Sequence, residues 1–181
     1  MEQPEVPLEH LQEHVERHAH ASGEQWVSWV ALSTAILAAF AAVCSLLAGF
    51  HANEAMINEI ESANQWAFYQ AKGIKSSVVD TRLELLKALG KATDPADAAK
   101  LAEYAREQKE IRAEAEQRQT KAQSHLHQHV ILARGVTMFQ ISIAVSAISA
   151  LTRKRRFWFV GLAFGMIGGV FLIQGLLPYH G

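Results

Sequence analysis

The sequence predicts an all-α protein with three transmembrane helices and a long antiparallel helical hairpin, of the coiled-coil kind, inserted between the first two spans. Hydrophobic residues make up 50% of the 181 residues, but they gather in three blocks with almost no charge. Each block has about the 20 residues that a helix needs to cross a bilayer core. The polar segment between the first and second blocks repeats with a helical period.

The first predicted span, residues 26–50, contains no charged residue. The second carries only Arg134, which lies in its first turn and can reach the lipid headgroups from there. Aromatic side chains concentrate at membrane interfaces, and Trp26 and Trp158 mark such an interface here. The full division is an acidic, histidine-rich amphipathic helix in 1–25, spans in 26–50, 130–151 and 157–177, a hairpin in 51–129, a loop in 152–156 and a tail in 178–181.

The loop between the second and third spans is strongly basic. Arg153, Lys154, Arg155 and Arg156 follow one another without interruption. Basic residues in short loops stay on the cytoplasmic side, so the N-terminus is predicted to be cytoplasmic and the hairpin periplasmic. The same residues can hold anionic lipid headgroups.

The first arm of the hairpin carries a coiled-coil stripe with polar interruptions, at 3-4 spacing. Its positions are Ile57, Ile60, Asn64, Ala67, Ala71, Ile74, Val78, Thr81 and Leu85. The turn is predicted near 90–95, where Gly90 suits a helix end and Asp94 with Pro95 suits a helix start. The inward positions of the second arm are predicted to be small or isolated, and they are Leu101, Ala105, Ala115, Ala122 and Leu126.

The aromatic run of the first arm favours contacts between copies. Trp66 and Tyr69 share one helix face, and Phe68 points elsewhere. A two-helix hairpin cannot cover apolar surface on several faces, so a homo-oligomer is predicted. The alternative is that these aromatic residues only cap the core of a single hairpin.

Three runs of the sequence resemble a known family: GEQWVSWVALSTAILAAFAAV, HANEAM and ANQWAFYQAKGIK. The chain resembles an uncharacterised bacterial membrane-protein family that is catalogued only as a domain of unknown function, and QWAFYQAK is the most specific part. The resemblance implies a prokaryotic multi-pass protein of the inner membrane with this three-span layout. It implies no activity and no site residues.

Small residues in the spans indicate close helix packing. Gly161, Gly165 and Gly169 repeat every four residues, which predicts a packing or oligomer contact. Gln140, near the middle of the second span, is interpreted as a hydrogen-bonding group between helices, with the lining of an oligomeric pore as the alternative.

The histidines flank the predicted spans, and a divalent transition metal is the alternative interpretation for them. His10, His14 and His18 are four residues apart, a spacing that brings helical side chains together. His51, His125 and His129 are predicted near the opposite membrane face. One helix supplies fewer than the four ligands of a closed zinc site, so the first group is interpreted as a solvated or interfacial helix and the second as polar residues at the membrane interface.

No enzyme is predicted, because the sequence has no phosphate loop, nucleophile–base spacing or dinucleotide fingerprint. A net charge of −1 excludes a global field for nucleic acid. The function that we predict is a non-enzymatic, homo-oligomeric scaffold whose partners are membrane lipid and further copies of itself. A metal-responsive membrane protein and an oligomeric pore are the alternatives.

Overall fold

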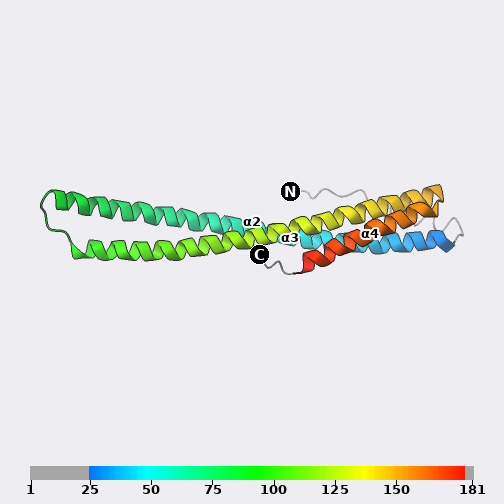
Figure 1. Cartoon of the computed structure of the whole chain (residues 1–181), viewed down its shortest axis with the longest axis horizontal. Coiled ribbons are helices and arrows are strands. Elements are labelled where there is room, and N and C mark those ends of the chain that lie inside the picture. The colour runs from blue at the N-terminus through cyan, green and yellow to red at the C-terminus, as the bar shows by residue number, and fades with distance from the viewer. Residues whose placement is uncertain (1–24, 178–181) are drawn as a thin grey trace. The chain divides into compact units, whose positions relative to one another are not determined.

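The computed structural model describes residues 25–177, and the predictions for 1–24 and 178–181 lie outside this range. The described chain forms α2 (Gln25–Ala88), α3 (Pro95–Thr152) and α4 (Arg155–Leu176), as Figure 1 shows. No strand occurs in this part of the chain. The all-α prediction is therefore confirmed. Each of the three helices is long and apolar enough to cross a membrane.

The contacts divide the chain into two units. The apolar unit comprises residues 25–52 and 126–177, and the hairpin unit comprises residues 53–125. Helices α2 and α3 contribute to both units, whereas α4 belongs to the apolar unit alone.

The turn of the hairpin unit forms by the predicted capping chemistry. Gly90 has a φ of +65°. The amide of Gly90 donates to the carbonyl oxygen of Lys87, and that of Lys91 donates to Leu86, which together make a Schellman motif. Asp94 then caps α3, because its Oδ1 accepts a 2.9 Å hydrogen bond from the amide of Ala96. The glycine and the aspartate thus end one arm and begin the next.

The two arms run side by side from this turn (Figure 1), but their seam uses another face of α2 than the predicted stripe. The positions of α2 that are buried or half-buried along the seam have a 3-4 spacing of their own: Ala55, Asn58, Ser62, Gln65, Tyr69, Lys72, Ser76, Val79, Leu83 and Leu86. Those of α3 are Asp97, Leu101, Tyr104, Gln108, Ile111, Ala115, Arg118 and Ala122.

The prediction that the Ile57–Leu85 stripe forms the seam is therefore wrong, because every residue of that stripe is exposed. On the second arm, Leu101, Ala115 and Ala122 lie inward as predicted, but the prediction is wrong for Ala105 and Leu126, which are exposed. Part of the physical reason lies in side-chain size. Near Ser62 and Ala115 small residues let the two backbones approach, whereas nearer the turn larger residues such as Leu83 and Leu101 fill the seam.

The apolar unit packs its three helices around one hydrophobic core. Leu37, Ala41 and Cys44 of α2 pack there against Phe139 and Ile143 of α3. The rings of Phe40 and Phe139 stack with centroids 6.1 Å apart. Helix α4 packs through glycines, which are its buried residues.

Candidate interaction surface

The stripe that α3 leaves uncovered is the most prominent surface of the hairpin unit. We call it the outer stripe: Ile57, Ile60, Asn64, Ala67, Ala71, Ile74, Val78, Thr81 and Leu85. Ile74 is 66% exposed and Val78 is 64% exposed. The other large exposed hydrophobic residues of residues 53–125 lie on α2 or, for Leu89, directly after its end, whereas α3 contributes none there. Large apolar side chains are thus concentrated on one arm.

The seam of the hairpin, by contrast, is rich in polar contacts. Ser62 Oγ donates a 3.0 Å hydrogen bond to the carbonyl oxygen of Ala115. Gln108 Nε2 donates one of 3.3 Å to the carbonyl oxygen of Tyr69. An ion pair joins Arg118 to Glu61. The seam therefore combines polar contacts with apolar residues such as Leu83 and Leu101, whereas the outer stripe leaves apolar side chains exposed.

A second ion pair crosses the seam between Lys72 and Glu107. The hydrogen bond that the Lys72 ammonium donates to the Glu107 carboxylate raises the pKa of Lys72 above its ordinary value. The ammonium group also lies 5.2 Å from the centre of the Tyr104 ring, which adds a cation–π contact. These contacts hold a charged residue at a position where a coiled coil would usually place an apolar one.

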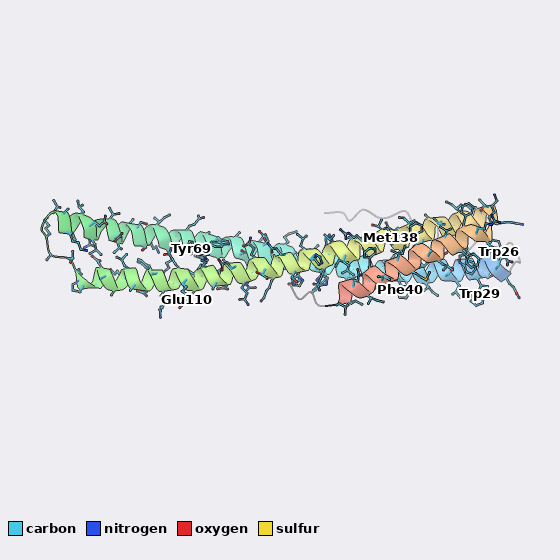
Figure 2. The ribbon with its side chains drawn as sticks, viewed as in Figure 1. Trp26, Trp29, Phe40, Tyr69, Glu110 and Met138 are labelled. Carbon is cyan, nitrogen blue, oxygen red and sulfur yellow. The ribbon has the colours of Figure 1, made fainter. Side chains whose placement is uncertain are left out.

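The aromatic run divides between the seam and the outside. Trp66 and Tyr69 share a face, as predicted, and their rings meet edge to face with centroids 5.6 Å apart. Figure 2 labels Tyr69 on α2. Phe68 points away from the seam and is 62% exposed, and it borders the outer stripe. The predicted contact of these residues with another copy stays a prediction.

The glycines of α4 lie against helices of the same chain. A Cβ added at Gly161 would lie 2.7 Å from Ser146 Oγ, and one added at Gly165 would lie 2.6 Å from Leu37 Cδ2. At Gly169 it would meet nothing within 4 Å. Of the three glycines predicted to contact another copy, Gly169 is thus the one with open space beside it.

Sequence reasoning missed several residues that join the helices of the apolar unit. Ser142 Oγ donates a 2.6 Å hydrogen bond to the carbonyl oxygen of Gly161. Trp158 Nε1 donates one of 3.0 Å to Ser33 Oγ. Gly175 leaves no room for a Cβ, which would lie 2.5 Å from Leu132 Cδ2. The serine spacing of α3 was visible in the sequence, but the partner of each serine depends on the packing of α4.

Gln140 is half-buried in α3. A groove in the apolar unit has an almost wholly apolar lining, which includes Phe40, Gly165, Met166, Gly169 and Ile173. Gln140 is not one of its lining residues. The role of Gln140 in helix contacts or in a pore stays a prediction.

The structure places some of the predicted metal ligands. His129 Nδ1 lies 2.9 Å from the carbonyl oxygen of Ala48, which can only accept, so this nitrogen carries the proton. The ring of His51 packs against Phe50, with centroids 5.4 Å apart, and His125 is half-buried on α3. Within residues 25–177 no group of three or more histidine, cysteine or carboxylate side chains is placed to hold a metal ion. His10, His14 and His18 lie outside the described residues.

The basic loop forms a tight link between α3 and α4. Arg153 has a φ of +53°, a left-handed conformation that costs a residue with a side chain about 1–2 kcal/mol. Lys154 accepts a 3.0 Å hydrogen bond at its carbonyl oxygen from Ser149 Oγ. The guanidinium of Arg155 lies 5.4 Å from the centre of the Trp26 ring. Arg153 thus occupies a position where glycine would be less strained.

No curated protein and no solved structure matches the chain. One family does match, over residues 26–178, and it is described as a domain of unknown function. This match covers all three described helices except one terminal residue, Gln25. The chain therefore belongs to the family "Domain of unknown function (DUF4337)".

Proposed function

We propose that this protein is a non-enzymatic scaffold of the prokaryotic inner membrane, built from several copies of the chain that associate through their helical hairpins. The observation that carries the proposal is the outer stripe, an exposed row of apolar side chains on an otherwise polar hairpin. Apolar rows of this kind mark interaction sites on soluble surfaces. A helical hairpin with a polar seam also gains little stability from its own packing, so contacts with further copies supply what it lacks.

Membrane anchorage is the second part of the proposal. The spans are residues 26–50, 130–151 and 157–177, and three helices of the structure have the length and composition for them. The basic loop supports a cytoplasmic position for the α3–α4 link and a periplasmic position for the hairpin.

The outer stripe favours the scaffold over the two alternatives. A metal-responsive protein would need ligands from residues outside 25–177 or from another copy, since residues 25–177 bring together no group of three or more metal-binding side chains. A pore would need several copies that turn Gln140 to a shared channel, and the scaffold already includes such an association.

The proposal is tested by the particle mass of the full chain in mild detergent, measured by light scattering. We expect a multiple of the 20.0 kDa chain mass. The double variant Ile74→Glu, Val78→Glu introduces charge into the outer stripe and should lower the mass to that of a monomer. The matched control, Ala105→Glu with Ala113→Glu, adds the same charge at exposed positions of α3 and should keep the oligomer. A wild-type monomer would contradict the proposal.

A further inference from the structure

The outer stripe has the heptad repeat of a coiled coil. With Ile57 as heptad position a, the a positions are Ile57, Asn64, Ala71, Val78 and Leu85, and the d positions are Ile60, Ala67, Ile74 and Thr81. The stripe runs for about four heptads, a length at which an a/d repeat indicates a coiled coil. That is roughly 40 Å at the helical rise. The whole length is exposed, so it is open to a second helix.

The same register continues along α2 into the apolar unit, because α2 is one helix of 64 residues. Counted back along the sequence, its positions there are Trp29, Leu32, Ile36, Ala39, Val43, Leu46 and Phe50, and all of them are exposed within that unit. The face that a second α2 would contact is therefore uncovered in each unit taken by itself.

Charges beside the stripe agree with a second copy in parallel orientation. In a parallel pair each g residue faces the e residue of the next heptad in the other helix. Gln70 would face the second copy's Lys75, and Ser77 would face its Arg82, so no like charges meet. Two copies anchored in one membrane with the same orientation are necessarily parallel. A second copy of this chain is thus the occupant that the stripe fits.

Asn64 supplies what an apolar stripe alone lacks, which is a group that fixes the register. An asparagine at an a position specifies both the register and the two-stranded state, at a cost in stability. Its carboxamide can donate and accept, so two facing Asn64 side chains satisfy each other. The neighbouring core positions are Ala67 and Ala71, and these small residues let the helices approach closely at that level.

We infer that two copies pair in parallel and in register through the outer stripe, with Asn64 of one copy facing Asn64 of the other. This inference rests on the proposed function, because it names the partner and the geometry of the same self-association. It goes further by setting the number of copies at the stripe to two and by assigning the register to a single residue.

Disulfide cross-linking of the full chain in membranes tests the pairing, in a Cys44→Ser background. The variants Ala71→Cys and Val78→Cys each place a thiol at an a position and should give disulfide-linked dimers on mild oxidation. Asp80→Cys, which is exposed on the same helix but off the stripe, should give none. In a mixture of differently tagged Ala71→Cys and Val78→Cys copies, no mixed dimer should form, because positions one heptad apart exceed disulfide reach.

Other outcomes separate this inference from the proposed function. Equal cross-linking of Asp80→Cys, or a mixed Ala71–Val78 dimer, overturns the in-register pairing. Cross-links at the exposed Met166 of α4, introduced as Met166→Cys, without any on α2 would keep the self-association and overturn the stripe as its surface. A monomeric particle without cross-links at any of these positions overturns both.

The role of Asn64 is tested by Asn64→Ile, which completes the apolar core. The particle should change from a dimer at the stripe to a mixture with larger assemblies, since the polar group that excludes them is lost. Ala113→Ile adds the same side chain on the exposed face of α3 and should leave the mass unchanged. A pure dimer after Asn64→Ile overturns the assignment of the register to this residue.

Discussion

Ser62 donates a 3.0 Å hydrogen bond to the main-chain oxygen of Ala115, and both residues are buried where the two arms of the hairpin meet. One small side chain thus reaches the backbone of the opposite arm. The contact requires close approach of the helices, which the methyl group of Ala115 allows. At this level the large apolar side chains of α2, Ile57 and Ile60, lie on another face and are exposed.

Ala115→Leu should destabilise the hairpin. Ala115 is 0% exposed, and the extra carbon atoms would push the arms apart and break the Ser62 hydrogen bond. Overpacking of this kind costs about 1–3 kcal/mol of unfolding free energy. Chemical unfolding followed by circular dichroism measures it. Ala113→Leu, at an exposed position of the same helix, is the control and should change stability by less than about 0.5 kcal/mol. Equal effects of both variants would contradict the close-packed seam.

Gly161→Ala should destabilise the apolar unit, because the new Cβ would lie 2.7 Å from Ser146 Oγ and 3.0 Å from the carbonyl oxygen of Ser142. We expect a loss of about 1–3 kcal/mol. Thermal unfolding in detergent measures this loss. Gly169→Ala makes the same chemical change where nothing lies within 4 Å, so it should leave stability unchanged or raise it. A larger loss of stability for Gly169→Ala than for Gly161→Ala would show that α4 packs by another face.

The hydrogen bond from Trp158 to Ser33 joins α4 to α2 and should contribute about 0.6 kcal/mol, the average for hydrogen bonds between helices in membranes. Trp158→Phe removes the donor, and Ser33→Ala removes the acceptor. In a double-mutant cycle the two losses should not add, because each removes the same bond. Additive losses would mean that the two side chains do not interact in the protein.

The Lys72–Glu107 ion pair predicts a dependence on alkaline pH. Glu107 raises the pKa of Lys72, so the ion pair stabilises the fold fully below the ordinary lysine pKa of about 10.4. That contribution is lost as the pH rises through the raised pKa. We would measure the midpoint of thermal unfolding from pH 8 to 12. At the lower pH values the midpoint should be higher for wild type than for Lys72→Met, and near pH 12 the two midpoints should become equal.

Lys109→Met, at an exposed position of α3, is the control for the alkaline titration. Its difference from wild type should be small and should not follow the same pH course. A constant difference between wild type and Lys72→Met across the whole range would show that the lysine acts through its packing alone.

The predicted orientation can be checked with membrane-impermeant maleimide on intact cells. In the Cys44→Ser background, Lys91→Cys at the hairpin turn should react from the periplasmic side, and Thr152→Cys beside the basic loop should react only after the inner membrane is opened. Both positions are exposed, so accessibility within the fold does not limit the reaction. The reverse pattern would place the hairpin in the cytoplasm.

The sequence by itself determined the helices and the turn. Long apolar blocks and helix-forming polar stretches predicted the all-α fold, and Gly90 and Asp94 located the end of one arm and the start of the next. These features are local, since a left-handed glycine and a capping carboxylate act on the backbone within a few residues. The ends of the helices can therefore be predicted without knowledge of the contacts between helices.

Only the tertiary structure decided which face of each helix meets a neighbour. The 3-4 spacing of the outer stripe predicts a helical partner, but it does not distinguish α3 from a second copy. The actual seam has a 3-4 spacing too, but many of its positions hold small or polar residues such as Ser62, so hydrophobicity alone does not mark it. Their hydrogen bonds go to main-chain oxygens of the opposite arm, as at Ala115. Every residue offers such an oxygen, so the pairing becomes visible only once the helices are placed side by side.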